Sequence, residues 1–431
     1  MNDILIVSED YPGYGGFGTY AWNLYNQIKD KFSTSLLYFS KTENSLVVCD
    51  NNVYSIFVPN FYQCIDMISN RTYHSLIIEK KIIDILKSHN LQRAKVVISI
   101  SPITMLLVDK FIKSSIHIYR VGSIRFKRIY NSDSLWKVNT DTINDMVTIN
   151  TIFENVLKKN ENISILPNSP MSELYMKHIK EKLNLNNRIY SNMIGLSYDF
   201  KTIAKCEKKY DLIFVTSNLM RKEKNLKLVE SIFKHFASEK KILIGHSIEK
   251  YANMFDNTKL YEYLPNASLL KKIAKTKVLI LPSHFDVGPS VIIESLFCNT
   301  VPIMSLNSGF SCLFENRYVC QTMDNKEWYD KINNILSCQI QQDEFANILT
   351  KIKHDRDAFS DLLATSIIKH NILNHNCQSE SELNIIEYTD PCHQVVISAN
   401  DNNIINQIMI SDKEIKQISQ SYTVPINILP I

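Results

Sequence analysis

Two carboxylates in the second half of the sequence flank a predicted helix start. The segment Leu279–Ser305 reads LILPSHFDVGPSVIIESLFCNTVPIMS, and within it Asp286 and Glu294 form the pattern D-x(7)-E. A predicted strand ends at Pro282, and Pro289 suits the first position of the helix that follows. The loop can therefore offer backbone N–H groups to a phosphate, while the two carboxylates accept hydrogen bonds from hydroxyl groups. Sugars and riboses that carry phosphate are ligands of this kind.

A basic loop, TSNLMRKEKN, occupies Thr216–Asn225 after the first predicted strand of the same half. Arg221, Lys222 and Lys224 precede a helix predicted from Asn225, and cations at a helix N-terminus are unfavourable unless an anion neutralises them. The loop therefore predicts a bound anion such as a diphosphate. The alternative is a solvated basic loop, because exposed lysine charges cost little in water.

Glycine is rare in this chain, and it is concentrated near the N-terminus. A chain of this length would carry roughly 30 glycines at average usage, yet this one has 9, of which Gly13, Gly15, Gly16 and Gly18 lie in the stretch YPGYGGFG. The letters GYGGFG fit G-x-G-x-x-G, but a dinucleotide site also needs an acidic residue at the end of the second strand. That strand, SLLYFS, ends in Ser40. A phosphate-binding helix start is therefore favoured over a nicotinamide site, and a plain glycine turn is the alternative.

Short strand-like segments alternate with helical patterns through most of the chain. The predicted strands are Ile4–Ser8, Ser35–Ser40, Val96–Ser101, Ile116–Val121, Met146–Asn150, Ile163–Pro167, Asp211–Thr216, Lys241–Gly245, Lys277–Pro282 and Val301–Ser305. The predicted helices are Tyr20–Ile28, Ser75–Ser88, one from Asn225, Ala267–Ala274, Ser290–Phe297 and most of Asp343–Leu373. This alternation predicts an α/β fold of two Rossmann-like, doubly wound parallel-sheet domains.

The predicted domains are residues 1–195 and 205–373, followed by a tail at 374–431 whose role the sequence does not reveal. The polar stretch Met171–Lys209 holds the predicted linker, and the tail has one strand-like segment, Gln394–Ser398. Two successive α/β domains leave a cleft, and ligands of such sheets bind beyond the carboxyl ends of the strands. We expect the motifs above to face that cleft.

Composition excludes several classes of protein. The net charge of +4 and pI of about 8.4 are too mild for a dedicated nucleic-acid binder. The nine cysteines lack paired C-x-x-C spacing, which predicts reduced thiols in the cytoplasm and argues against a zinc site. The N-terminus, MNDILIVSED, is typical of a first strand rather than a signal peptide. No apolar segment is long enough to span a bilayer, although peripheral membrane contact stays open.

Four motifs resemble those of the retaining family-4 glycosyltransferases of the GT-B fold. DVGPSVIIESLFCNTVPI resembles the E-x(7)-E signature of the family, with Asn299 where the family prefers Gly; Asn tolerates the left-handed conformation that ends a helix. The opening P-x-x-GG-x(6)-NL resembles the donor-phosphate loop, and LPNS at Leu166–Ser169 resembles I-P-N-G. The basic loop resembles the one whose Arg and Lys bind the diphosphate. The resemblance covers about Met1 to Asn374.

This resemblance implies roles for individual residues. Glu294 would hold the ribose hydroxyls, and Asp286 would face the donor sugar near its anomeric carbon. Lys224, helped by Arg221, would neutralise the leaving diphosphate, so neither a metal nor a cofactor is expected. The one D-x-D, Asp355–Asp357, lies in a helical pattern and is predicted to be a surface feature. The implied catalytic residues are Asp286, Lys224 and Arg221, and the implied donor-binding residues are Gly15, Gly16, Gly288, Ser290, Val291 and Glu294.

The sequence also departs from the family at three places. Asp286 is one methylene shorter than the family's Glu, and Ser217 and Asn218 replace its G-R. Val121 stands where a histidine is often found, and His117 lies too early on the strand to replace it.

Two functions therefore remain open. The first is a retaining hexosyltransferase that uses a nucleotide sugar, UDP- or GDP-linked, and a glycan, lipid or protein acceptor. The second is a degenerate GT-B module that binds nucleotide or carbohydrate without turnover. Neither the donor base, the sugar, the acceptor nor the oligomeric state can be read from the sequence.

Overall fold

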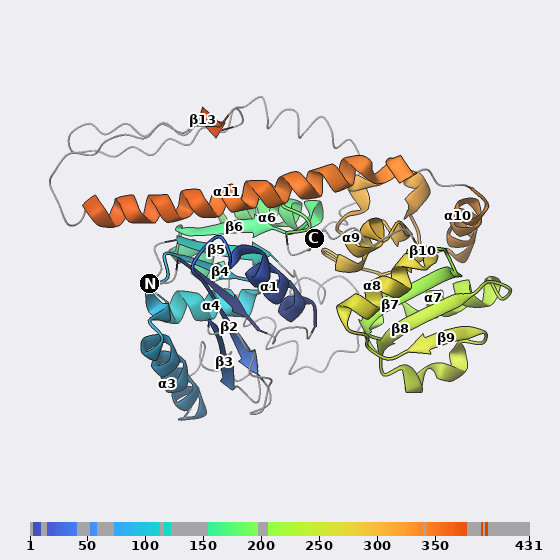
Figure 1. Cartoon of the computed structure of the whole chain (residues 1–431), viewed down its shortest axis with the longest axis horizontal. Coiled ribbons are helices and arrows are strands. Elements are labelled where there is room, and N and C mark those ends of the chain that lie inside the picture. The colour runs from blue at the N-terminus through green and yellow to red at the C-terminus, as the bar shows by residue number, and fades with distance from the viewer. Residues whose placement is uncertain are drawn as a thin grey trace. The chain divides into compact units, whose positions relative to one another are not determined.

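The computed structural model describes residues 3–9, 15–40, 52–57, 73–112, 116–121, 154–196, 206–338, 342–376, 389–390 and 393–394 (Figure 1). The chain forms two compact units, Met1–His370 and Asn371–Ile431. The first unit contains two six-stranded sheets, and the second contains the antiparallel pair β13 (Thr389–Asp390) and β14 (His393–Gln394). The domain boundaries at 195, 205 and 373 stay predictions. Within the described ranges, no helix combines the length and the apolar character that crossing a bilayer requires.

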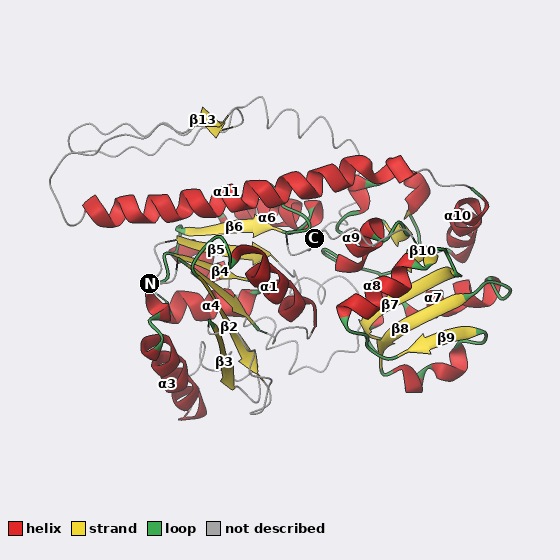
Figure 2. Cartoon of the chain, in the orientation of Figure 1, coloured by secondary structure: helices red, strands yellow, loops and turns green. Residues whose placement is uncertain are grey.

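The first sheet has the strand order β3-β2-β1-β4-β5-β6, with every pair parallel. All residues of the central strand β1 are buried, as expected for a parallel sheet covered on both faces. Figure 2 shows the strands of the sheets in yellow and the helices beside them in red. The strands are β1 (Ile4–Ser8), β2 (Thr34–Ser40), β3 (Val53–Phe57), β4 (Val96–Ser99), β5 (Ile116–Val121) and β6 (Ile163–Pro167), and the helices include α1 (Gly15–Ile28), α3 (Tyr73–Ser88), α4 (Pro102–Phe111) and α6 (Pro170–Leu183).

The second sheet repeats this topology. Its strand order is β12-β11-β10-β7-β8-β9. If β7 is counted as its first strand and the order is read from β9, it is the same as the order of the first sheet. Both sheets therefore have the doubly wound order 3-2-1-4-5-6, and the predicted fold class is confirmed. The strands are β7 (Tyr210–Asn218), β8 (Lys241–His246), β9 (Thr258–Tyr261), β10 (Thr276–Leu281), β11 (Val301–Ser305) and β12 (Val319–Cys320), and the helices are α7 (Leu226–His235), α8 (Asn266–Ala274), α9 (Ser290–Phe297), α10 (Asn325–Ser337) and α11 (Ala346–Asn376).

Several elements were not predicted. The stretch expected to be linker begins with α6, whose N-terminus is fixed by a capping box between Ser169 and Ser172 and by a proline in the first turn. The strands β3, β9 and β12 and the helices α4 and α10 were also missed. Two predicted strands lie wholly or largely outside the described residues. They are Met146–Asn150 and Gln394–Ser398, of which only Gln394 is described.

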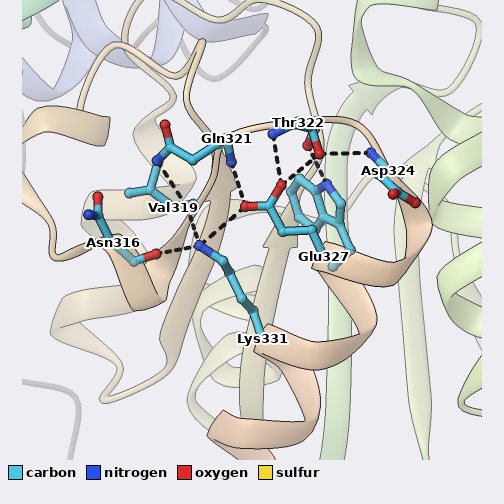
Figure 3. Close-up of polar contacts among 8 residues, drawn as sticks. Asn316, Val319, Gln321, Thr322, Asp324, Glu327 and Lys331 are labelled. Carbon is cyan, nitrogen blue, oxygen red and sulfur yellow. Dashed lines mark hydrogen bonds and ion pairs between the residues drawn. The ribbon is translucent and has the colours of Figure 1, made fainter. Parts of the chain in front are cut away.

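A polar network fixes the turn between β12 and α10 (Figure 3). The carboxylate of Glu327 accepts hydrogen bonds from the backbone N–H groups of Gln321 at 2.7 Å and Thr322 at 2.8 Å, and from the Thr322 hydroxyl at 2.7 Å. Lys331 pairs with Glu327 at 3.3 Å and also donates to two backbone carbonyls of the preceding turn. Asp324 caps the helix by accepting from the N–H of Lys326 at 3.0 Å. The network therefore sets where α10 begins.

The segment after α6 contributes to the cores of both sheets. Ile194 belongs to the core of the second sheet, together with Ile352 of α11. Leu196 belongs to the core of the first sheet, together with Phe359 and Leu363 of α11. Two residues of the connection between the sheets, Ile194 and Leu196, are therefore buried in the two cores.

Candidate functional site

Lys224 and Asp286 meet in one site although they are distant in the sequence. Lys224 ends a 3-10 turn that follows β7, and Asp286 lies in the loop between β10 and α9. The ammonium group of Lys224 donates to Oδ2 of Asp286, and Lys224 is only 8% exposed. Both loops follow the carboxyl ends of neighbouring strands in the second sheet, which is where ligands of doubly wound sheets bind.

Arg221 lies beside this pair and has a carboxylate partner of its own. Its Nε donates to Glu223 at 2.6 Å, and Nη1 donates to the hydroxyl of Ser217 at 3.2 Å. The backbone carbonyl of Glu223 accepts from the N–H of His284 at 2.8 Å, which joins the basic loop to the loop that carries Asp286. These cations directly precede α7, as predicted, but they lie in a short 3-10 turn of their own: Asn225, at φ 54°, ends that turn and is also the N-cap of α7.

The loop that carries Asp286 is held by the segment after β11. The N–H of Asp286 donates to the carbonyl of Asn307 at 3.1 Å, and the N–H of Gly309 donates to the carbonyl of Asp286 at 2.7 Å. These bonds form a parallel bridge between Asp286 and Ser308. A Cβ on Gly309 would lie 1.6 Å from the carbonyl oxygen of Val287, so only glycine allows this close approach.

The same loop contacts the N-terminal half of the chain. Val287 packs in the core of the first sheet, and its carbonyl accepts a hydrogen bond from the hydroxyl of Ser169. A Cβ on Gly288 would lie 2.8 Å from the side-chain nitrogen of Asn168. Asn168 and Ser169 belong to the LPNS motif, which therefore lies against the candidate donor loop.

The N-terminus of α9 presents backbone N–H groups without a side-chain cap. Pro289 occupies the cap position and makes no capping hydrogen bond, and the first turn contains no acidic residue. The N–H groups of Ser290 and Val291 at such a helix start favour an anion. After the helix, Asn299 adopts φ 53°, the left-handed conformation expected from its place in the motif.

Glu294 is buried in α9 and has an amide partner. Its side chain is 6% exposed, and Nδ2 of Asn266 donates to its Oε1 at 3.2 Å. Burial raises the pKa of the Glu294 carboxyl to about 7, and the hydrogen bond from Asn266 offsets part of that rise. Asn266 was not predicted from the sequence; it starts α8, and only the packing of α8 against α9 brings it to Glu294.

Gly15 and Gly16 are the first residues of α1, which begins well before the predicted Tyr20. Gly16 is exposed, and a Cβ placed on it would meet no atom within 4 Å. Open space at the first turn of a helix allows a ligand to approach the backbone. Gly13 lies outside the described residues.

A stacked ring pair beyond β8 and β9 was also missed by the sequence analysis. The rings of His246 and Tyr263 lie 4.9 Å apart and 4° from parallel, and Tyr263 is 38% exposed. Glu262 contacts Nδ1 of His246 at 3.4 Å and accepts from the N–H of Ile248 at 3.1 Å. The signal available in the sequence was an aromatic residue two positions after a strand, at the sheet edge that holds the other motifs.

The D-x-D motif is helical, as predicted, and Asp357 is exposed, but Asp355 is not a surface residue. Asp355 is 5% exposed, and its carboxylate accepts from the backbone N–H of Ile194 at 2.9 Å and from Lys351 at 2.9 Å. Asp355 therefore attaches α11 to the connection between the sheets. The helical pattern did not reveal this burial, because the partner of Asp355, the backbone N–H of Ile194, lies 161 residues away in the sequence.

Comparisons with known proteins agree with this fold. Residues 199–351 match the family model of glycosyl transferases group 1. No curated protein sequence matches the chain. Sucrose-phosphate synthase from Thermosynechococcus elongatus aligns with a TM-score of 0.60 at 13% identity, over 88% of this chain and 100% of that one.

Two further solved structures have the same architecture. WaaG, a glycosyltransferase involved in lipopolysaccharide biosynthesis, aligns with a TM-score of 0.55 at 12% identity, over 86% of this chain and 99% of its own. The α,α-trehalose 6-phosphate synthase from Burkholderia multivorans aligns with a TM-score of 0.57 at 11% identity, over 89% and 100%. The chain therefore has the GT-B fold, and its segment 199–351 matches the model of the group 1 glycosyltransferases.

Proposed function

We propose that this protein is a retaining glycosyltransferase of the family-4 kind, which transfers a hexosyl group from a nucleotide sugar without a metal ion. The acceptor is a glycan, a lipid or a protein. The observation that carries the proposal is the contact between Lys224 and Asp286, because it joins a cation for the leaving group to a carboxylate for the sugar in one site.

In the proposed reaction, the bond between the anomeric carbon and the diphosphate oxygen breaks, and negative charge develops on the diphosphate. The buried ammonium of Lys224 and the N–H groups of Ser290 and Val291 would stabilise that charge. Arg221, whose side chain is 40% exposed, would supply a second cation. Asp286 would face the donor sugar near its anomeric carbon.

The nucleoside would bind beside this centre. Asn266 engages Oε1 of Glu294 and leaves Oε2 for a ribose hydroxyl. The ring of Tyr263, which is 38% exposed and stacked on His246, would lie beside the base. A UDP- or GDP-sugar is the proposed donor; one of the matched structures is described as trehalose-6-phosphate from E. coli bound with UDP-2-fluoro glucose.

We propose the cytoplasm as the location, on the ground of the cysteine pattern. The cysteines that the structure describes are free rather than disulfide-bonded: Cys206, Cys298, Cys312, Cys320 and Cys338. Peripheral contact with a membrane is compatible with a lipid acceptor.

The test is release of free nucleotide from a panel of UDP-, GDP-, ADP- and CMP-sugars, with and without EDTA. Glu294→Ala should abolish release, whereas Glu207→Ala, at an exposed glutamate, should not. The anomeric configuration of the product, measured by NMR, tests retention. Silence across the panel while a nucleotide still raises the melting temperature would instead identify the degenerate binding module. Silence in both measurements would contradict the nucleotide site as well.

A further inference from the structure

A cavity of about 260 Å³ lies at the amino ends of strands in the second sheet. Lys208 precedes β7, Lys277 lies in β10 next to its first residue, and Asn299 precedes β11, and all three line the cavity. Lys224 and Asp286 follow the carboxyl ends of β7 and β10. The cavity is therefore at the opposite edge of the sheet from the proposed donor site.

The wall of this cavity is apolar. It is formed by side chains of helices α9, α10 and α11, of the start of β11 and of the turn before α11, and three of these residues are less than 7% exposed. The apolar lining residues are Leu296, Val301, Ile335, Leu336, Phe345 and Leu349. At about 30 Å³ per water in the liquid, the space equals several water molecules and can hold a small organic ligand.

Lys208 places a positive charge against this apolar wall. Its Nζ donates to the hydroxyl of Thr300 at 3.1 Å and to the carbonyl of Cys298 at 3.3 Å, and both acceptors are neutral. Burial lowers the pKa of Lys208 to about 8, and the nearby thiols offset part of that effect. Within the described ranges, no carboxylate pairs with this ammonium group, which retains a third N–H donor.

The second lysine of the cavity is already neutralised. Lys277 pairs with Asp211 at 2.8 Å, so the two lysines and this carboxylate together leave one positive charge, that of Lys208. A single cation beside an apolar wall complements a ligand with one negative charge and a hydrocarbon part. A multiply charged anion such as inorganic phosphate would have negative charge that Lys208 cannot neutralise, and it would make no favourable contact with the apolar wall.

We propose that this cavity binds a medium-chain carboxylate, with Lys208 as the counter-charge and the hydrocarbon chain against the apolar wall. The site is separate from the proposed donor site and does not depend on the proposed transferase activity.

The first test is calorimetric titration of the full chain, without nucleotide, with butanoate, hexanoate, octanoate and decanoate. Affinity should rise about fourfold per added CH₂ group until the cavity is filled. Octan-1-ol, which has the chain but no charge, and inorganic phosphate should bind at least about tenfold more weakly than octanoate. Equal affinity for octanol and octanoate would overturn the role of Lys208, and no octanoate binding would overturn the site.

Variants separate the charge from the shape of the cavity. Lys208→Met keeps most of the side-chain stem and should lower octanoate affinity at least about tenfold without changing that for octanol. Lys209→Met, at the exposed neighbouring lysine, is the matched control and should bind as wild type. Leu336→Trp, which fills space but keeps the charge, should abolish the dependence on chain length. Glu294→Ala should bind octanoate normally, so failure of this site and failure of the donor site are distinguishable. Wild-type octanoate affinity in Lys208→Met of normal melting temperature would overturn the proposal.

Discussion

Lys224 and Asp286 pair through largely buried side chains, which are 10% and 17% exposed. If the ammonium group of Lys224 neutralises the leaving diphosphate, Lys224→Met should lower kcat about 10²- to 10³-fold, as loss of one fixed transition-state donor does. Lys222→Met removes the same charge from an exposed neighbour in the same turn and should change kcat less than about threefold. The measurement is nucleotide release at saturating donor. Wild-type turnover in Lys224→Met would rule out its proposed role.

The buried carboxyl group of Glu294 gives a prediction about stability and pH. Burial raises its pKa from 4.5 to about 7, so the unfolded chain releases this proton at lower pH than the folded protein does. Stability should therefore fall as the pH rises from about 4.5 to about 7. Glu294→Gln should remove the cost of ionising this buried carboxyl group, which is on the order of 3 kcal/mol of folding stability. The variant should therefore be more stable than wild type near about pH 8 and equally stable near about pH 4. Urea unfolding at both pH values checks this, with Glu207→Gln as the exposed control; a pH-independent difference would contradict it.

For single residues, the sequence pointed to candidates but not to their contacts. The D-x(7)-E spacing and the basic loop singled out Asp286, Glu294 and Lys224 as candidates because these residues lie within local motifs. The partner of Glu294 could not be read in the same way, because Asn266 precedes it by 28 residues and belongs to another helix. The pairing of Lys224 with Asp286 likewise depends on the order of the strands, which no local pattern reports.

The Glu327 network predicts how the end of the second sheet responds to acid. Burial opposes ionisation of Glu327, but hydrogen bonds from the N–H groups of Gln321 and Thr322, from the Thr322 hydroxyl and from Lys331 together outweigh it and lower the pKa of Glu327. Its stabilising contribution is therefore present above the usual carboxyl pKa and is lost as the pH falls through the lowered one. Glu327→Gln should destabilise the protein by about 1 to 3 kcal/mol at neutral pH and by less in acid.

Urea unfolding followed by tryptophan fluorescence checks this prediction. Trp328 is fully buried in α10, and its indole N–H donates to the carbonyl of Thr322 at 3.1 Å, so it reports on this turn. Glu315→Gln is the matched control: Glu315 pairs with Arg317 at 3.0 Å but is 68% exposed, so its loss should cost less than about 1 kcal/mol. Equal effects of the two variants would mean that the network contributes no more than a surface pair.

Elements were predicted where their hydrophobic pattern is strong. The central strands β1 and β10 are buried along nearly their whole length and were found to within one residue at each end. The missed strands β3, β9 and β12 lie at or next to sheet edges or are only two residues long, so their sequences carry little apolar signal. The early start of α1 was hidden because glycine has a poor helix propensity, although Gly15 and Gly16 open that helix.

For the whole molecule, the repeated strand and helix pattern predicted two similar sheets, and both have the same strand order. The way in which the chain connects them was not predictable. Ile194 and Leu196 enter the cores of different sheets, and α11 contributes side chains to both. The polar composition of this stretch predicted a linker. It did not predict the burial of these two residues, because that burial depends on α11, which follows more than a hundred residues later.

Gly195 lies between those two residues, and its surroundings leave no room for a larger side chain. It has φ +71°, and a Cβ placed on it would lie 2.4 Å from Cγ2 of Ile352. Gly195→Ala should therefore destabilise the protein through two separable effects, about 1 kcal/mol of backbone strain and about 1 to 3 kcal/mol of overpacking. Ile352→Ala removes the clash but not the strain, so adding Gly195→Ala to Ile352→Ala should cost only about 1 kcal/mol more.

Urea unfolding of the single and double variants measures that coupling. Gly16→Ala is the contrasting control: it lies in the first turn of α1 with open space around the added Cβ, so it should leave stability unchanged or raise it by up to about 1 kcal/mol. Because Gly16 is a proposed donor-binding residue, the same variant should lose nucleotide release while remaining folded. If Gly195→Ala has the same free energy of unfolding as Gly16→Ala, the segment 193–196 can shift without loss of stability. The packing of Ile194 and Leu196 would then not fix the position of this segment.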